Sequence, residues 1–339
     1  MSNALLLAQP PFPWFSTIWQ QLTEQVRVNR LPHALLFKGT DGIGAAELAA
    51  AFAQFLLCRS PLESRACGRC RGCELLIAGT HPDFILVAPE EGSSVIKIAQ
   101  IRELAQRVAN TAQQGGRKVI VLTPTEAMNI EASNALLKNL EEPSGDTVFI
   151  LVSYQIARVL PTIRSRTSQL ALVAPTYPQA LDWLNDHSLP NAEALLTAAG
   201  GPVKALQWSQ SGLMAVFNEA DHCLNDVIKG DLSPIDGAKK MASYDLVVFF
   251  GFVQHWLQAS IRHNFNAQFV TGQSAQAFTA YPMAARFTLL DAVQTRLAQL
   301  YSGSNPNKVL ACEEFLLVLL GLKAGLDAGA KTKSRYASR

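Results

Sequence analysis

The chain has 339 residues, of which 49% are hydrophobic and 17% charged, and 29 basic against 27 acidic residues give a formal net charge of +2. This length excludes a disulfide-stapled mini-protein, and the hydrophobic fraction excludes a disordered chain. We therefore expect two or three domains, each with its own core. A net charge so close to zero argues against a protein that coats DNA or an anionic membrane by itself.

Targeting signals and cysteine usage indicate where the chain works. No apolar run approaches the roughly 18 residues needed to cross a bilayer, and the first residues lack the basic region and cleavage site of a signal peptide. Four of the six cysteines lie within sixteen residues, and the other two are isolated. The apolar runs predict no membrane association. The cysteine spacing argues against a disulfide framework and predicts a cytoplasmic, reducing environment with a local metal site.

The first half of the chain alternates short apolar runs with helical patterns. The spacing predicts strands at Ala34–Phe37, Phe84–Val87, Lys118–Leu122 and Val148–Val152, and helices at Ala45–Leu57, Ile98–Asn110 and Glu131–Leu140. Such alternation favours a parallel sheet with helices on both faces. Ligands of these folds bind at the carboxyl ends of the strands, so the loops after Phe37, Leu122 and Val152 are the candidate sites.

The second half has only helical spacing. A last strand-like run at Leu170–Val173 precedes Pro175 and Pro178, which mark a domain boundary. The predicted fold class is α/β plus all-α: an α/β core of residues 1–174, a small helical domain of residues 175–212, a larger helical domain of residues 213–330 and a basic tail of residues 331–339. The tail has four basic residues and no acid, so without it the net charge changes from +2 to −2.

A glycine-rich turn follows the first strand and leads into a helix. Gly39 and Gly44, with Gly42 between them, lie at the spacing of the two glycines of the phosphate-binding P-loop, G-x-x-x-x-G-K-[ST]. The lysine of that motif reaches the β- and γ-phosphates, and its hydroxyl holds Mg²⁺. Ala45 and Ala46 occupy those two positions. The backbone amides at the helix start can still cradle a phosphate, and a glycine turn without a ligand is the alternative.

The second phosphate-binding element is altered as well. Active P-loop ATPases have an Asp-Glu pair after an apolar strand, whereas Thr123 and Pro124 follow Leu122 here, and Glu126 lies two residues too far along. Positioning and charge stabilisation supply nearly all the catalysis of phosphoryl transfer. We therefore expect no ATP turnover by this chain.

The clustered cysteines have the spacing of a metal site. Cys58, Cys67, Cys70 and Cys73 follow the pattern C-x8-C-x2-C-x2-C. Four thiolates at this spacing suit tetrahedral Zn²⁺ and leave no position open for water, which predicts structural zinc. The alternatives are free cysteines or a redox-active pair at Cys67 and Cys70, which leaves two thiols unexplained. His81 is an alternative ligand, although its His-Pro-Asp context also fits a turn.

A capped helix and an arginine-rich loop follow the third strand. Asn129 is a typical N-cap, and Pro143 ends the helix that it starts. Farther along, Arg164, Ser165 and Arg166 lie in a loop beside the carboxyl edge of the predicted sheet. An arginine there can reach a γ-phosphate bound by a neighbouring subunit, and such a finger raises the rate by orders of magnitude. A solvated surface arginine is the alternative.

These motifs, taken in order, closely resemble the delta-prime subunits of the bacterial DNA polymerase III clamp loader, within the AAA+ clamp-loader family. The resemblance rests on the degenerate P-loop, the four-cysteine insert, His-Pro-Asp, N-A-L-L-K-x-L-E-E-P and Ser-Arg, and it covers residues 30–170 strongly. It implies an AAA+ core with a zinc module, a helical lid at residues 175–212, and a helical domain at residues 213–330 that joins a pentameric collar.

The resemblance also implies a function. Arg166, preceded by Ser165, would supply an arginine finger to ATP bound in an adjacent gamma/tau motor subunit, and Arg164 is the second choice. The chain would carry structural Zn²⁺, with ATP only at the neighbour's site. It would act with the delta subunit, the sliding clamp and primed DNA, as part of a DNA-directed DNA polymerase holoenzyme, with no ATPase or polymerase chemistry of its own.

Two positions depart from the family pattern. Thr167 stands where the family usually has cysteine after Ser-Arg, and Val203, followed by Lys204, stands near the position of the lid arginine of the active members. The absence of an arginine at Val203 also argues against ATP hydrolysis by this chain. An active clamp-loader-type ATPase and a zinc-dependent nucleic-acid-binding module are the alternative functions.

Overall fold

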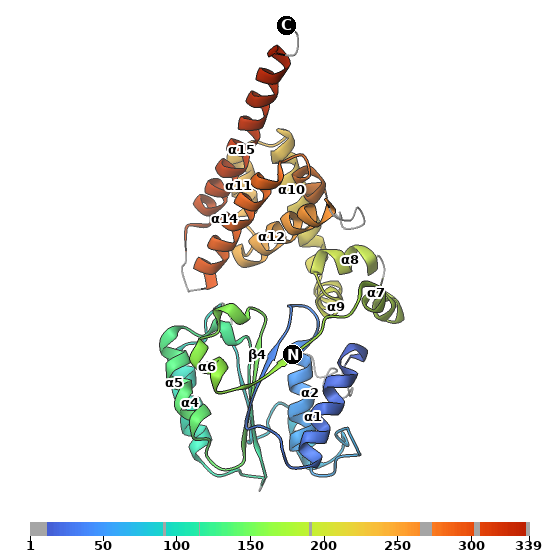
Figure 1. Ribbon diagram of the computed structural model, residues 1–339, viewed down its shortest axis with the longest axis vertical. Helices are drawn as coiled ribbons and strands as arrows, with labels where there is room; N and C mark the ends of the chain where they lie inside the picture. The colour runs from blue at the N-terminus through green and yellow to red at the C-terminus, as the bar shows by residue number, and fades with distance from the viewer. Residues whose placement is uncertain are drawn as a thin grey trace. The chain divides into compact units, whose positions relative to one another are not determined.

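The chain forms two compact units, Met1–Ala180 and Leu181–Arg339. The computed structural model describes residues 12–90, 93–114, 116–189, 192–264, 273–301 and 306–336. The sheet lies in the first unit, and the described part of the second unit is helical (Figure 1). None of the described helices has the length and apolar character needed to cross a membrane.

Five parallel strands form the sheet, in the order β2-β3-β4-β1-β5. Their bounds are β1 Ala34–Lys38, β2 Phe84–Val87, β3 Lys118–Leu122, β4 Thr147–Ser153 and β5 Ser168–Ala171. In the register of the central strands, Leu36 of β1 lies opposite Leu151 of β4 and Gln169 of β5. All residues of β3 and β4 are buried, which explains why the sequence shows continuous apolar runs in place of alternation.

Helices cover both faces of this sheet. They are α1 Ser16–Arg27, α2 Ala45–Leu57, α3 Arg71–Ile77, α4 Ile98–Ala109, α5 Ile130–Glu141 and α6 Pro161–Ser165, with 3-10 turns η2 Pro13–Phe15, η3 Thr125–Ala127 and η4 Ile156–Arg158. Figure 1 shows β4 between α1 and α2 on one side and α4, α5 and α6 on the other. Leu36 and Leu151 share one buried cluster with Leu104 of α4 and Leu136 of α5. The predicted sheet with helices on both faces is confirmed.

The edge strand β5 differs from the prediction. It spans Ser168–Ala171, not Leu170–Val173, because its register is set by pairing with β1, where Leu35 lies opposite Ser168. Val173 is 74% exposed. The apolar run therefore marks the exit of the chain from the sheet as well as part of its last strand.

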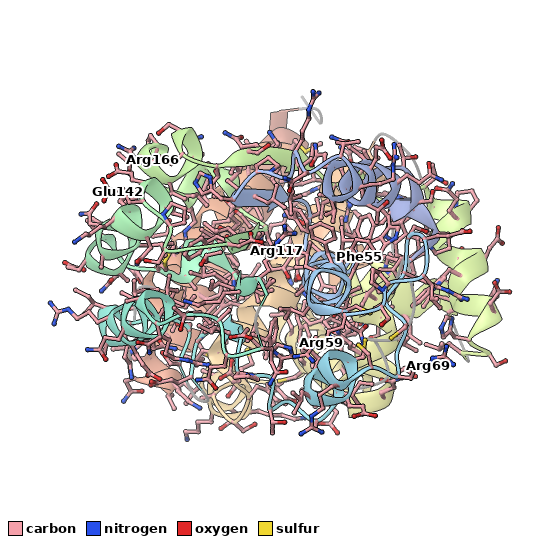
Figure 2. All side chains as sticks on the ribbon, turned by 90° about the horizontal axis from the view of Figure 1, so that it is seen from below. Phe55, Arg59, Arg69, Arg117, Glu142 and Arg166 are labelled. Atoms are coloured by element: carbon pink, nitrogen blue, oxygen red, sulfur yellow. The ribbon has the colours of Figure 1, made fainter. Side chains whose placement is uncertain are left out.

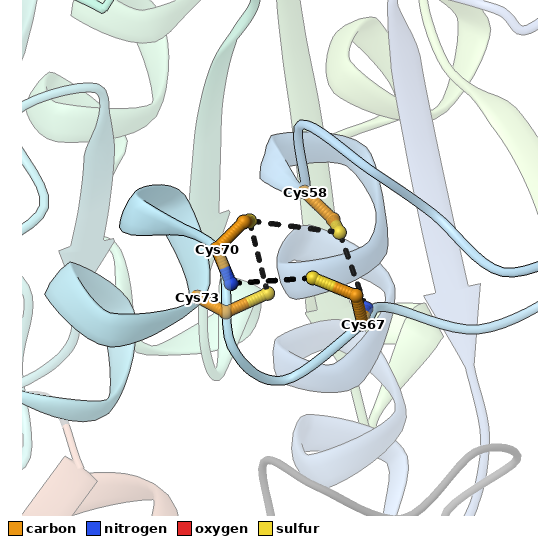
Figure 3. A group of neighbouring side chains, drawn as sticks. All are labelled: Cys58, Cys67, Cys70 and Cys73. Atoms are coloured by element: carbon orange, nitrogen blue, oxygen red, sulfur yellow. Dashed lines mark hydrogen bonds between the residues drawn. The ribbon is translucent and has the colours of Figure 1, made fainter.

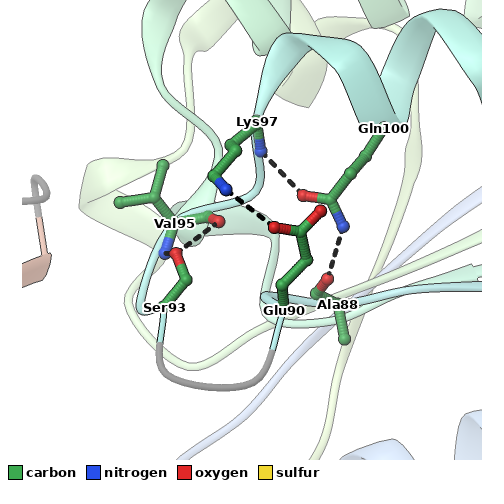
Figure 4. Close-up of polar contacts among 6 residues, drawn as sticks. All are labelled: Ala88, Glu90, Ser93, Val95, Lys97 and Gln100. Atoms are coloured by element: carbon green, nitrogen blue, oxygen red, sulfur yellow. Dashed lines mark hydrogen bonds and ion pairs between the residues drawn. The ribbon is translucent and has the colours of Figure 1, made fainter.

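Polar contacts define the start of α4 (Figure 4). The Gln100 side chain accepts a hydrogen bond from the backbone N–H of Lys97 (2.9 Å) and donates to the carbonyl of Ala88 (2.8 Å). Lys97 Nζ also lies 2.7 Å from the Glu90 carboxylate. An exposed ion pair contributes about 0–1 kcal/mol. The Gln100 contacts matter more, since they satisfy a backbone donor that the helix leaves free.

The second unit is built from helices. They are α8 Ala192–Ala199, α9 Pro202–Ser211, α10 Leu213–Lys229, α11 Pro234–Met241, α12 Leu246–His263, α13 Gln273–Phe278, α14 Met283–Tyr301 and α15 Lys308–Tyr336, preceded by α7 Tyr177–Asp186, which spans the division between the units. The backbone of α15 continues into the predicted basic tail, whose residues 337–339 lie outside the described residues. The division of this unit into a lid and a collar domain stays a prediction.

An aromatic cluster fills part of the second unit. Phe217 packs edge-on against Phe252 with ring centroids 5.0 Å apart, and Trp208 and Trp256 lie 5.6 and 5.1 Å from Phe217. His255 lies beside them, with its ring 6.5 Å from that of Phe217. Burial lowers the pKa of His255 to about 3, so this imidazole is neutral at physiological pH.

Candidate functional site

The glycine loop joins β1 to α2 in the predicted strand-turn-helix form. Gly42 and Gly44 have φ angles of 86° and 92°, a left-handed conformation that favours glycine. Gly44 is the N-cap of α2 and makes no side-chain capping bond. The backbone N–H of Gly39 donates to the carbonyl of Ser153 at 3.1 Å. The loop is thereby tied to the carboxyl end of β4, where nucleotide-binding folds place their ligand.

An aromatic side chain lies directly against this loop. Phe12 is 1% exposed and stacks on Trp14 with ring centroids 5.1 Å apart, while Trp14 Nε1 donates to the carbonyl of Ile43 at 2.9 Å. A Cβ atom added to Gly44 would lie 2.1 Å from the Phe12 ring. The segment before α1 therefore closes over the turn at the start of α2, a contact that the sequence pattern did not indicate.

Thr123 and Glu126 follow strand β3, and Tyr154 follows strand β4. Thr123, in the position of the missing aspartate, hydrogen-bonds with the side chain of Tyr154, which follows β4. Burial raises the pKa of the Tyr154 hydroxyl, and the bond with Thr123 opposes that rise. Glu126 is 9% exposed, and its Oε1 accepts the backbone N–H groups of Tyr154 (2.9 Å) and Gln155 (3.0 Å). This carboxylate fixes the chain after β4.

Three carboxylates lie around Tyr154 at this edge of the sheet. The carboxylates of Asp41, Glu47 and Glu126 are close enough to Tyr154 to raise the pKa of its hydroxyl further. The loop of residues 39–44 contains Asp41 and no basic residue. The loop therefore lacks the basic side chain with which a P-loop lysine attracts a triphosphate.

The four predicted cysteine ligands come together at the end of α2 (Figure 3). Their sulfur atoms all lie within 4.8 Å of one another, with Cys70 Sγ 3.8 Å from Cys58 Sγ and 3.6 Å from Cys73 Sγ. The backbone N–H of Cys67 donates to Cys58 Sγ at 3.2 Å, and that of Cys70 donates to Cys67 Sγ at 3.3 Å. The cluster can hold a metal ion, and all four cysteines are free of disulfide bonds.

The local environment shifts the pKa values of two of these thiols in opposite directions. Burial acts to raise the pKa of Cys70, but backbone N–H groups and the neighbouring thiols lower it to about 6. Burial raises the pKa of Cys73 strongly. The thiol of Cys70 is therefore the more readily ionised of the two, and the more deeply buried thiol of Cys73 the less readily.

His81 does not join the cysteine cluster. It is 6% exposed, and its Nδ1 accepts the backbone N–H of Asp83 at 3.1 Å. Asp83 in turn accepts the backbone N–H groups of Gln113 (2.7 Å) and Gln114 (2.8 Å). The His-Pro-Asp sequence is thus the turn that the alternative interpretation favoured, and it fastens the loop before β3.

The arginine loop forms a short helix, α6, with Arg166 as its C-cap. Arg166 Nε donates to Glu141 Oε1 at 2.5 Å, and Nη1 donates to the carbonyl of Thr162 at 3.1 Å and to Ser165 Oγ at 3.4 Å. The side chain of Arg166 is 35% exposed and that of Glu141 48% exposed. The guanidinium is therefore held at the surface by a carboxylate, a carbonyl and a hydroxyl.

The second arginine of this loop lies differently. The Nε atom of Arg164 is buried and has no hydrogen-bond partner within the described part of the chain. In Figure 2, Arg166 lies well apart from Arg59 and Arg69, which neighbour Cys58 and Cys70 in the sequence. The arginine loop and the cysteine cluster are thus separate features of the first unit.

Val203 and Lys204, which the resemblance places near the arginine of active family members, lie in α9. Val203 is 3% exposed within α9, and Lys204 Nζ lies over the ring of Trp208, 5.7 Å from its centroid. Val203 has no charge to offer, and the ammonium of its neighbour contacts an aromatic face.

Several known proteins are similar in sequence to this chain. A family model described as "DNA polymerase III, delta subunit" matches residues 15–176. The DNA polymerase III subunit delta' of Pseudomonas aeruginosa is 39% identical over 257 residues, which cover 74% of this chain and 77% of that protein. The subunit delta' of Escherichia coli is 37% identical over 199 residues, covering 58% and 60%. The first of these matches is longer than the sheet-containing unit.

A solved structure matches more of the chain at lower identity. It is a DNA polymerase III gamma subunit-related protein from Thermotoga maritima, 16% identical, which covers 88% of this chain and 98% of its own with a TM-score of 0.49.

Proposed function

Because the chain belongs to the family of DNA polymerase III delta' subunits and has the AAA+ type of parallel sheet, we propose that it is a non-hydrolysing subunit of a clamp-loader complex. In this role Arg166 completes the ATP site of a neighbouring motor subunit, and the chain helps to load the sliding clamp on primed DNA. The proposal rests on one combination: the guanidinium of Arg166 is held at the surface by hydrogen bonds, while the ring of Phe12 lies against the chain's own glycine loop.

The lack of hydrolysis rests on what surrounds the glycine loop. Ala45 and Ala46 provide neither the ammonium nor the hydroxyl of a working P-loop, and Thr123 provides no carboxylate for Mg²⁺. The ring of Phe12 lies against Gly44 and is buried there. Without the lysine, the hydroxyl and the carboxylate, Gly39, Gly42 and Gly44 form a turn that supports no nucleotide hydrolysis.

The finger assignment favours Arg166 over Arg164. Arg166 lies at the end of α6 with its guanidinium oriented by Glu141, Thr162 and Ser165, whereas Arg164 has a buried Nε. A finger supplied in trans neutralises the charge that develops on the transferred phosphoryl group, and it raises the rate by about 10³–10⁵-fold. Ser165 contributes by orienting the guanidinium.

We assign structural Zn²⁺ to the four cysteines. A tetrahedron with Zn–S bonds of about 2.3 Å has sulfur atoms about 3.8 Å apart, close to the 3.6 and 3.8 Å separations around Cys70. Four thiolate ligands leave no position open for water. The ion would hold the chain between α2 and α3 in place and would take no part in hydrolysis.

The proposed partners are gamma/tau motor subunits and the delta subunit, with the sliding clamp and primed DNA reached through the complex. Residues 175–212 would form a lid, and residues 213–330 would join a pentameric collar through their helices. The net charge of −2 without the tail supports a subunit that depends on partners for much of its contact with DNA.

Reconstitution with gamma/tau and delta tests the proposal. Arg166→Ala should lower turnover at the neighbouring ATP site by about 10³-fold, seen as loss of that site's share of the clamp- and DNA-stimulated ATPase, while gel filtration shows an intact complex. Arg27→Ala, which removes an exposed arginine paired with Glu24, is the control and should have no effect. Unchanged ATPase in an intact Arg166→Ala complex would refute the finger assignment.

The isolated chain separates the remaining alternatives. With ATP and Mg²⁺ it should show no turnover, and turnover that is lost on mutation of Gly44 would indicate an active ATPase. DNA binding by the isolated chain that weakens steeply with salt and disappears on chelation would indicate a zinc-dependent nucleic-acid-binding module.

A further inference from the structure

We infer that Glu141 is a positioning residue for the Arg166 finger, an inference that rests on the proposed function. Glu141 is the last residue of α5 and Arg166 the C-cap of α6, so the pair joins two helices that are separate in sequence. Of the three contacts that orient the guanidinium, the 2.5 Å contact between Arg166 Nε and Glu141 Oε1 is the one that joins two opposite charges.

The contacts leave one edge of the guanidinium free. Arginine has five N–H groups, and here Nε points to Glu141 while Nη1 points to the Thr162 carbonyl and Ser165 Oγ. Ser165 Oγ donates its own hydrogen to the Thr162 carbonyl at 3.0 Å, so it can accept from Arg166. No contact of Nη2 occurs among the described residues. A phosphate oxygen can therefore bind at Nη2 while Glu141 keeps its place at Nε.

Stability alone does not account for a glutamate at this position. The two side chains are 35% and 48% exposed, and exposed ion pairs contribute little to folding. A carboxylate in the last turn of a helix also faces the negative end of the helix dipole, which is unfavourable. The arrangement is easier to explain by its effect on Arg166 than by its effect on the fold.

Glu141 orients the guanidinium of Arg166 before a phosphate binds. A free arginine side chain samples many rotamers and loses that freedom when it binds. A guanidinium that is already restrained at Nε and Nη1 loses less, so more of the interaction is available at the transition state. Glu141 would thus increase turnover by the neighbouring subunit without touching its ATP.

Glu141→Gln in the reconstituted complex tests this role, because it removes the charge and keeps the size of the side chain. We expect the Arg166-dependent part of the stimulated kcat to fall about 10-fold, less than for Arg166→Ala, with the KM for ATP unchanged. Glu141→Asp, which keeps the charge, should recover part of the loss. Glu142→Gln is the matched control, since it changes the adjacent acid, and it should leave kcat unchanged.

A double variant separates positioning from other effects. Because Glu141 acts through Arg166, Arg166→Ala with Glu141→Gln should be no slower than Arg166→Ala alone. A slower double variant, a higher kcat for Glu141→Gln, or an equal loss for Glu142→Gln would overturn the inference. If Arg166→Ala lowers the ATPase and Glu141→Gln does not, the inference fails and the proposed function stands. If Arg166→Ala has no effect, the proposed function itself fails.

Discussion

The contact between Phe12 and Gly44 can be tested by adding one methyl group. Gly44→Ala places alanine at a φ of 92°, and left-handed backbone costs an L-residue about 1–2 kcal/mol. The new Cβ would lie 2.1 Å from the Phe12 ring, so the ring has to leave. Exposing a buried phenylalanine costs about 1.5–3 kcal/mol. The free energy of unfolding should therefore fall by about 2.5–5 kcal/mol in total.

Two further variants isolate the contribution of the ring. Gly145 has a φ of 63°, and nothing lies within 4 Å of a Cβ added there, so Gly145→Ala should cost the backbone strain alone, about 1–2 kcal/mol. In a Phe12→Ala background, Gly44→Ala should also cost only that strain. The double-mutant cycle should give a coupling of about 1.5–3 kcal/mol between Phe12 and Gly44.

Thermal unfolding followed by circular dichroism measures these differences. For a unit of this size, 1 kcal/mol shifts Tm by about 2–4 °C, so Gly44→Ala should lower the Tm of the first unit by about 5–20 °C and Gly145→Ala by about 2–8 °C. Equal shifts for Gly44→Ala and Gly145→Ala, or an undiminished cost of Gly44→Ala without the Phe12 ring, would show that Phe12 does not close the loop.

Two other predictions concern the cysteine cluster and the second unit. The Cys67→Ser variant should release Zn²⁺ to a chromogenic chelator at least about 10-fold faster than the unmodified chain. Cys223→Ser changes a buried cysteine outside the cluster and should leave the release rate unchanged. Equal release rates for the two variants would contradict the zinc assignment. Burial holds the pKa of folded His255 at about 3, below the unfolded value of about 6.5. The contribution of neutral His255 to the free energy of unfolding should therefore be fully present above about pH 6.5. As the pH is lowered from about 6.5 towards 3, that free energy should decrease by up to about 1.4 kcal/mol per pH unit. His255→Gln should flatten that dependence in urea unfolding, and an unchanged slope would contradict it.

Local sequence patterns predicted the strands of the first unit and its helices α2, α4 and α5, but not α1, α3 or α6. Apolar runs of four or five residues between helical patterns became β1 to β4, and α2 has the predicted bounds Ala45–Leu57. The N-cap at Asn129 is present, with its side chain accepting from the backbone N–H of Ala132 at 2.9 Å. The cysteines were predictable for a similar reason, since the ligands of a compact metal site lie close together in the sequence.

The side chains that modify the site were not predictable in this way. Phe12 precedes the first predicted element, and its position against Gly44 depends on a contact across more than thirty residues. Tyr154 and Glu141 follow or end regular elements, where periodicity gives no information on the direction of a side chain. The register of β5 depends on its pairing with β1. Each of these features is fixed by tertiary contacts.

Helix α2 connects the two unusual regions of the first unit. It starts next to Gly44 and ends next to Cys58, so its thirteen residues span about 20 Å. Ten of its residues are buried, including Leu48 and Phe52, and a helix enclosed on nearly all sides cannot slide without disturbing the sheet. The sheet and its surrounding core thus hold both ends of α2 in place, so the glycine turn at its start and Cys58 at its end keep a fixed separation.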